Sequence, residues 1–238
     1  MKVYILVEGE CTELQLYPEW IQHLCPNLPH HKTVDEYGQA KNGFYIVSGF
    51  GYPSMLNHIE NSIKDITQYG GDYFITILDA EEDSVEEKKR VINDCISQFT
   101  VPTRVNTHVI VQNRCVETIL LGNPSKIPRV NLTNPFDEYF NYYNVIQNDP
   151  ELMGCYTEGD NHAKFHLKYL KQAFKIKKIR YSKSNCRDVL PKTFLDGITA
   201  RVAVKGDMHS FGEFITLFSE ISEKIVVQDE SESEMVQN

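Results

Sequence analysis

The chain has 238 residues, of which 41% are hydrophobic and 24% are charged, so it can bury a full hydrophobic core. Its formal net charge of -9 argues against a protein that coats nucleic acid through its overall field, so a polyanion would have to bind a local basic patch. The 6 cysteines are scattered without a C-x-x-C pair, and no segment has the apolar length of a membrane span, so we expect a reduced, cytoplasmic protein outside the membrane.

The chain starts with an apolar run over residues 3–7, which is too short for the apolar region of a signal peptide. This run predicts a strand buried on both faces of a parallel sheet, and it ends at Glu8 and Gly9. A helix is expected next, capped by Thr12 and extending to residue 24. The first elements therefore predict a strand, an acidic turn and a helix.

The following segments repeat this alternation of strand and helix. Further strands are expected at residues 44–47, 73–78 and 105–111, and helices at residues 55–66 and 85–99. Asp79 stands at the carboxyl end of the third of the four strands. The order predicts an α/β fold with a mostly parallel sheet flanked by helices.

The pattern changes after Gly122 to a connector rich in Pro, Asn and Tyr, followed by helical segments. These helices are expected at residues 137–146, 161–174 and 211–221, with a short strand at residues 178–181 that returns to the sheet edge. We therefore predict an α/β domain over residues 1–125, a mostly helical accessory region over residues 126–225, and a disordered acidic tail over residues 226–238.

Acidic side chains follow two of the predicted strands at their carboxyl ends. Glu8 follows the first strand, and Asp79 follows the third with Glu81 two residues later. The carboxyl ends of parallel strands meet at one edge of a sheet, where ligands bind in open α/β folds. Carboxylates gathered there repel each other unless a divalent cation is present, and oxygen ligands select Mg²⁺ or Mn²⁺. The sequence predicts a metal site suited to phosphoryl chemistry.

At these residues the chain resembles the TOPRIM fold of topoisomerases, primases and overcoming-lysogenization-defect nucleases. Residues 7–13 read Val-Glu-Gly-Glu-Cys-Thr-Glu, and residues 79–81 read Asp-Ala-Glu where the family has Asp-x-Asp. The closer likeness is to small stand-alone TOPRIM-related proteins of bacterial defence and mobile loci. Residues 115–121, Cys-Val-Glu-Thr-Ile-Leu-Leu, are similar to their later Glu-x-Trp-Leu-Leu segment, with Ile119 in place of the tryptophan.

The resemblance implies roles for the acidic residues. Glu8 would bind metal or manage a proton, and Asp79 and Glu81 would hold the metal. Gly9 would keep the turn tight. A second metal, as nucleases use, would be held by the remaining candidates, Asp83 and Glu117. The alternative is that these carboxylates only stabilise the first turns of helices, at roughly 0.3–1 kcal/mol each.

A basic segment follows in a chain that is otherwise acidic. Residues 161–187 contain no carboxylate, and the spacing of the lysines places four of them on one helical stripe. The candidate phosphate-binding residues are Lys164, Lys168, Lys171, Lys175, Lys177, Lys178 and Arg180, and Lys183 is a candidate for stabilising transition-state charge at the metal site. The alternatives are a solvated helix face, or contact with an acidic partner or with a second subunit in a homodimer.

Two functional hypotheses follow. The first is a Mg²⁺-dependent (or Mn²⁺-dependent) endonuclease that cuts DNA or RNA, tRNA included, as a toxic effector in anti-phage defence. The resemblance implies an ABC-type ATPase as its partner. The second is a non-catalytic TOPRIM-like regulatory or binding subunit, in which the carboxylates hold a structural ion or none.

Overall fold

The computed structural model describes residues 1–156 and 158–236, and over these residues five strands form one parallel sheet in the order β2-β3-β1-β4-β5. The strands are β1 (Lys2–Val7), β2 (His30–His31), β3 (Gly43–Ser48), β4 (Tyr73–Asp79) and β5 (Asn106–Gln112). The predicted α/β class with a parallel sheet is confirmed. The finer assignment to the TOPRIM fold stays a prediction.

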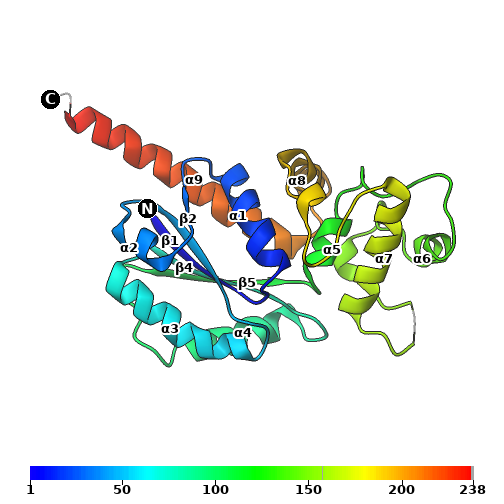
Figure 1. Ribbon diagram of the computed structural model, residues 1–238, viewed down its shortest axis with the longest axis horizontal. Coiled ribbons are helices and arrows are strands. Elements are labelled where there is room, and N and C mark those ends of the chain that lie inside the picture. Colours follow the sequence, from blue (N-terminus) through cyan, green and yellow to red (C-terminus); the bar gives the residue numbers. More distant parts are fainter. Residues whose placement is uncertain (157, 237–238) are drawn as a thin grey trace.

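Helices cover both faces of the sheet (Figure 1). The helices are α1 (Thr12–Leu24), α2 (Val34–Gln39), α3 (Ser54–Tyr69), α4 (Val85–Ile96), α5 (Val116–Leu121), α6 (Phe136–Tyr142), α7 (His162–Lys177), α8 (Lys192–Lys205) and α9 (His209–Val236). Side chains alternate along β1, so that Val3, Ile5 and Val7 pack toward α1 and α9, while Tyr4 and Leu6 pack toward α2, α3 and α4. The near-continuous apolar run at the start of the chain reflects this burial on both faces.

The helix starts follow capping chemistry. Ser84 and Glu87 form a capping box at the start of α4, and Thr33 and Glu36 form another at α2. The side chain of Asn161 accepts from the backbone N–H of Lys164 and caps α7. These caps fix where each helix leaves its loop, and so set the positions of the loops at the carboxyl edge of the sheet.

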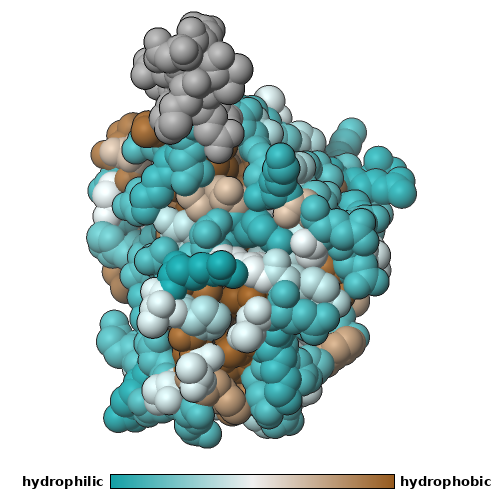
Figure 2. Space-filling model, turned by 90° about the vertical axis from the view of Figure 1, so that its left-hand side faces the viewer, coloured by the Kyte–Doolittle hydropathy of each residue, from teal (hydrophilic) through white to brown (hydrophobic). Residues whose placement is uncertain are grey.

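Helix α5, at the end of the predicted α/β domain, and the accessory helices α6 and α7 lie beyond the carboxyl ends of the strands (Figure 1). One hydrophobic core joins them to the sheet, because residues of α7 such as Phe165 and Leu170 belong to the same buried cluster as Val3 and Ile5. The opposite end of the molecule is covered mostly by hydrophilic side chains with smaller apolar areas between them (Figure 2). Because the accessory region lies beyond the carboxyl ends of the strands, it faces the loops that carry the acidic residues.

Three expectations differ from the structure. Residues 178–181 form no strand within the described chain: Lys178 ends α7 in a left-handed conformation with φ 58°, and the only pairing nearby is an isolated bridge between Ser182 and Asn185. Thr12 does not cap α1 through its side chain, because its hydroxyl donates instead to the Lys183 carbonyl at 3.2 Å. Both differences arise from contacts distant in sequence.

The third difference concerns the C-terminal segment. Helix α9 packs on β5 and α1, so it belongs to the α/β layer and not to the accessory region. Its buried residues, Phe211, Phe214, Phe218, Ile221 and Ile225, recur at helical spacing. Where we expected a disordered tail over residues 226–238, the helix continues to Val236, since no Pro or Gly interrupts it. Residues 237–238 lie outside the described residues.

Candidate active site

The acidic residues lie between two neighbouring strands whose connecting helices pack on opposite faces of the sheet. β1 pairs with β3 on one side and with β4 on the other, all in parallel. The chain leaves β1 through α1 on one face of the sheet, and it leaves β4 through α4 on the opposite face. In open α/β sheets ligands bind at such a topological switch point, outside the carboxyl ends of the two strands. Glu8 directly follows β1, and Asp79 is the last residue of β4.

Glu8 is fixed by the backbone of two neighbouring loops. Its Oε2 accepts a hydrogen bond from the backbone N–H of Asp79 at 3.0 Å, and its Oε1 accepts one from Tyr52 at 3.2 Å. Burial raises the pKa of Glu8, and the charge of Glu81 adds to this, against the lowering effect of the two hydrogen bonds and of Lys88. The structure thus joins the end of β1 to the end of β4 through this one carboxylate.

Asp79 is surrounded by other carboxylates. Burial raises its pKa well above the usual range, and the negative charges of Glu8, Glu13 and Glu117 raise it further, while Lys183 lowers it. We call Glu8, Glu13, Asp79 and Glu117 the carboxylate cluster. Its members come from the ends of β1 and β4 and from the first turns of α1 and α5. Aspartates whose pKa is shifted by burial and by neighbouring charges are typical of functional sites.

Glu13 belongs to the acidic motif at residues 7–13 without a predicted role, and the structure places it in the cluster. Its carboxylate lies against Gly9, where a Cβ would overlap it. Burial raises the pKa of Glu13, and the charges of Glu117 and Glu8 contribute to the shift. Gly9 therefore makes room for a carboxylate, in addition to the predicted tight turn. The sequence shows only that Glu13 lies in the first turn of the helix that begins at Thr12, four residues after Glu8.

Glu117 and Lys183 bring the accessory region to the cluster. Glu117 is only 3% exposed, and its Oε1 accepts a hydrogen bond from the hydroxyl of Tyr181 at 3.0 Å. Burial lowers the pKa of Lys183, but the charges of Glu117, Asp79 and Glu13 outweigh this and raise it overall. The structure therefore gathers Glu117 and Lys183 with Asp79. Tyr181 was not predicted, because its contact spans 64 residues of sequence.

Glu81 and Asp83 lie apart from these contacts. Glu81 is exposed, with a backbone φ of 52°, and its backbone N–H donates to the carbonyl of Arg114 at 2.9 Å. Asp83 pairs with the buried Lys88, whose Nζ lies 3.2 Å from Asp83 Oδ2 and 3.6 Å from the centre of the Tyr52 ring. Glu81 acts on Glu8 through its charge, whereas Asp83 is neutralised by a lysine.

The side chains of the cluster have the chemistry to bind a divalent cation, but they are not yet arranged around one. Among the side chains that the structure describes, no three or more Asp, Glu, His or Cys are already arranged to hold a metal ion. The donors are nevertheless all oxygens with excess negative charge, which fits Mg²⁺ or Mn²⁺. Gln112 faces Asp79 in the adjacent strand, and its buried Oε1 lacks a hydrogen-bond partner among the described residues. Binding would require rotamer changes that close these oxygens around the ion.

The predicted basic face divides into two parts. Lys164 and Lys168 both bind the carboxylate of Asp160, at 2.9 Å and 2.5 Å, and these hydrogen bonds lower its pKa. The remaining predicted cations are exposed: Lys171, Lys175, Lys177, Lys178 and Arg180. Of these, Arg180 lies 3.7 Å from Asp188. Within the described residues, the unpaired positive charge is therefore at the C-terminal end of α7.

Helix α7 is attached to the site by two histidines. His162 Nδ1 lies 2.7 Å from Glu82 Oε2, which ties the start of α7 to the loop after β4. His166 is fully buried, and its Nδ1 lies 2.7 Å from the hydroxyl of Thr118, next to Glu117. Burial lowers the pKa of His166 to about 4, so it packs as a neutral side chain. These contacts position the helix that carries the lysines.

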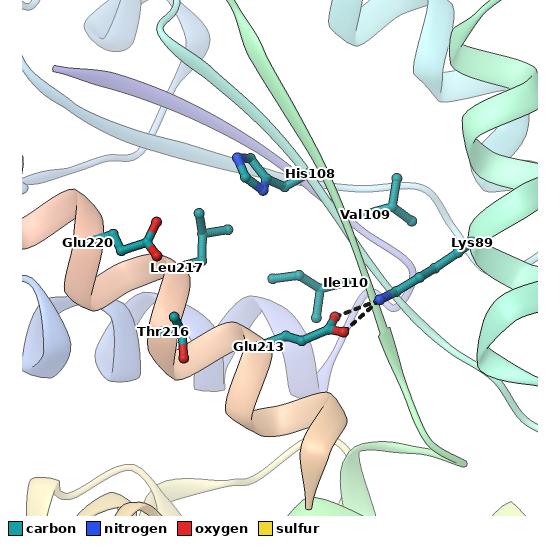
Figure 3. A pocket seen from close by; sticks show the side chains of 8 residues that line it. All are labelled: Lys89, His108, Val109, Ile110, Glu213, Thr216, Leu217 and Glu220. Carbon is teal, nitrogen blue, oxygen red and sulfur yellow. Dashed lines mark hydrogen bonds and ion pairs between the residues drawn. The ribbon is translucent and has the colours of Figure 1, made fainter.

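A separate pocket lies along the free edge of β5 (Figure 3). It has a volume of about 410 Å³ and is bordered by α4 and α9, and Lys89 and Glu213 pair across it at 2.7 Å. As far as the structure describes the chain, its lining contains none of the carboxylate cluster. The pocket is therefore a different site from the carboxylate cluster.

No protein-family model, curated protein or solved structure matches this chain. In the part of the chain that the structure describes, no helix combines the length and the apolar character needed to cross a membrane. The functional assignment therefore depends on the chemistry of the site.

Proposed function

We propose that the chain is a Mg²⁺-dependent or Mn²⁺-dependent nuclease that hydrolyses phosphodiester bonds at the carboxylate cluster. The observation that carries this proposal is the position of Asp79, whose pKa is raised by burial and by three neighbouring carboxylates, with the cation of Lys183 beside them. Uncompensated negative charge at a switch point favours a divalent ion, and a lysine at the same place favours an anionic substrate.

The residues of the cluster would have distinct tasks. Asp79 and Glu13 would hold the ion together with Glu117, which Tyr181 orients through its hydroxyl. When bound, the ion would polarise the phosphoryl group and activate water. Glu8 would accept a proton from the attacking water, because its raised pKa brings it closer to neutral pH. Lys183 would stabilise the negative charge that develops on the phosphoryl oxygens.

The exposed lysines of α7 support a nucleic-acid substrate. Lys171, Lys175 and Lys177 are exposed on α7, and this helix packs against α5, which carries Glu117. A nucleic-acid backbone that reaches the cluster from the accessory region would bind these lysines. Whether the backbone belongs to DNA or RNA, tRNA included, is part of the test.

The test is cleavage of plasmid DNA, single-stranded DNA and tRNA with Mg²⁺ or Mn²⁺ by the wild type, Glu8→Gln and Asp79→Asn. Glu10→Gln is the matched control, since Glu10 is an exposed glutamate two residues after Glu8. We expect both cluster variants to lose at least about a hundredfold in rate, the scale of losing one charge-stabilising group. Equal cleavage by all four proteins would refute the proposal.

A role as a toxic effector in anti-phage defence, with an ABC-type ATPase partner, is the cellular form of this proposal. It derives from the resemblance of residues 7–13 to stand-alone TOPRIM-related proteins. Growth arrest on expression, alone or together with an ABC-type ATPase partner, should depend on Asp79. Arrest that persists in Asp79→Asn would contradict it.

The second candidate is a non-catalytic regulatory or binding subunit. It is favoured by the lack of a preformed set of three metal ligands among the described side chains, and by the two backbone hydrogen bonds that already occupy Glu8. On this hypothesis the protein binds nucleic acid or its partner with equal affinity in the wild type and in Asp79→Asn, and neither protein cleaves. The cleavage assay therefore separates the two candidates.

A further inference from the structure

Two aromatic side chains lie exposed at the same edge of the sheet as the carboxylate cluster. The loop over residues 49–53 joins β3 to α3, and Phe50 is 58% exposed on it, while Tyr52 is 37% exposed. Phe50 also has a left-handed backbone with φ 58°, which a phenylalanine rarely adopts. The loop therefore exposes a large apolar ring to solvent, and the backbone conformation at this residue is an unfavourable one.

Hydrogen bonds fix this loop to the turn that carries Glu8. The backbone N–H of Gly49 donates to the Val7 carbonyl at 2.7 Å, and that of Gly51 donates to the Glu8 carbonyl at 2.8 Å. The N–H of Phe50 donates to Ser48 Oγ at 2.9 Å. The N–H of Tyr52 also donates to the Glu8 carboxylate, so the loop is hydrogen-bonded to both the backbone and the side chain of Glu8. The position of the Phe50 ring is therefore set relative to Glu8.

The two aromatic rings differ in the surface that they leave free. The ring of Tyr52 has the Lys88 ammonium 3.6 Å from its centre. The ring of Phe50 leans on His58 of α3, with 5.3 Å between ring centres, and the rest of it faces solvent. His58 supports the ring from the body of the protein. Phe50 therefore has an open surface for a flat ligand.

We propose that Phe50 is a stacking platform for an unpaired base of a single-stranded nucleic acid whose backbone crosses the carboxylate cluster. This inference rests on the proposed function, because the cluster and Lys183 supply the phosphate site. An aromatic ring stacks on any base, so it binds without sequence preference. In a duplex the bases are already stacked on one another, so Phe50 favours single strands, loops and ends. The occupant is thus an unstacked nucleotide.

The strand would be held at three places along this edge. Phe50 would stack one base, a divalent cation held by the cluster would bind the adjacent phosphate, and Lys183 with the exposed lysines of α7 would hold the backbone beyond it. Phe50 lies on the β3 side of Glu8, whereas Lys183 lies on the side of α1 and α5. These positions define the path of the nucleic-acid strand across the edge of the sheet.

The test is binding of short single-stranded DNA and RNA oligonucleotides that contain 2-aminopurine, with Ca²⁺ in place of Mg²⁺ so that the cluster holds a divalent cation while cleavage is suppressed. Stacking quenches 2-aminopurine fluorescence, so the readout reports the contact itself. The variants are Phe50→Ala, the aromatic replacement Phe50→Trp, and the control Tyr142→Ala, which removes a comparably exposed aromatic ring from α6. A duplex of the same sequence is measured in parallel.

We expect Phe50→Ala to lose quenching and to bind single strands about 5- to 150-fold more weakly, which corresponds to ~1–3 kcal/mol for one stacked base. Phe50→Trp and Tyr142→Ala should keep the wild-type affinity. Equal affinity and quenching in the wild type and Phe50→Ala, or tighter binding of the duplex, would overturn the inference. If the wild type stacks the base but does not cleave with Mg²⁺ or Mn²⁺, the proposed function fails and this inference stands. If Phe50→Ala cleaves and binds as the wild type does, this inference fails and the proposed function stands.

Discussion

The carboxylate cluster and the basic face of α7 hold their charges in opposite ways. In the cluster, Asp79 and Glu13 are crowded by like charges that raise their pKa, so the folded protein is destabilised there. On α7, Lys164 and Lys168 are neutralised by Asp160, and the other lysines extend into solvent. Solvated charges lower folding stability little. Crowded buried carboxylates lower it more, so a protein that keeps them is expected to use them to bind a ligand. The cluster is therefore the stronger indication of function.

The largest effect in this comparison is expected from Lys183, the cation inside the cluster. Lys183→Met should lower the cleavage rate by about 10²–10³, because a group aimed at developing charge is lost. Lys171→Met, on the solvated face, is the matched control and should change the rate little. The check is kcat on a short oligonucleotide at saturating substrate. A Lys183→Met rate equal to that of the control would remove Lys183 from the site.

Gly9 tests the packing of the cluster. Gly9→Ala places a Cβ where the Glu13 carboxylate lies, so this flexible side chain must turn away, and we expect a loss of about 0.5–1.5 kcal/mol in unfolding free energy, together with slower cleavage. In a Glu13→Ala background the same substitution should not lower the unfolding free energy, because the overlap is gone. Urea unfolding of the four proteins measures both effects. An equal loss in the two backgrounds would show that the overlap is not the cause.

Asp79 also predicts a pH dependence of stability. Its pKa in the folded protein is raised above the ordinary value of 3.8, so the folded state holds this proton more tightly than the unfolded state. Stability is therefore lost as the pH rises from about 4 through the raised folded pKa. Asp79→Asn escapes this loss and should melt a few degrees higher than the wild type at pH 7.5, since 1 kcal/mol shifts Tm by about 2–4 °C.

The difference in Tm between Asp79→Asn and the wild type should shrink as the pH is lowered toward 4. Thermal unfolding in EDTA between pH 4.5 and 8 measures it, with Glu10→Gln as the exposed control. A lower Tm for Asp79→Asn at pH 7.5 would mean that the charged aspartate stabilises the fold, contrary to the account of the cluster.

The smallest effect is expected on the basic face. Lys171→Ala/Lys175→Ala should reduce the slope of log affinity against log salt by about 1.4–1.8, because two phosphate contacts are lost. Lys164→Ala/Lys168→Ala should reduce it less, since both lysines are already bound to Asp160. Fluorescence anisotropy of a single-stranded oligonucleotide at several salt concentrations gives both slopes. Identical slopes for the two pairs would show that α7 binds nucleic acid as a uniform stripe, or does not bind it.

The meeting of Glu8 and Asp79 could be predicted because it follows from two apolar runs and the rule that parallel strands end at one edge. The position of Glu13 could not, since it depends on how closely α1 approaches Gly9. Tyr181 and Lys183 reach the cluster through a segment without secondary structure, held by contacts to Glu117 and Thr12. The prediction of a strand at residues 178–181 was wrong, because the sequence Lys-Ile-Arg-Tyr does not reveal that Lys178 adopts a left-handed conformation.

The central claim is that the carboxylate cluster binds a divalent cation. An anomalous difference map from crystals grown with Mn²⁺ tests it most directly, with Asp79→Asn crystals as the comparison. We predict a Mn²⁺ peak within coordination distance of Asp79 and of at least one of Glu8, Glu13 and Glu117 in the wild type, and none in the variant. A wild-type map without a peak at Asp79, at a Mn²⁺ concentration that supports cleavage, would contradict the account.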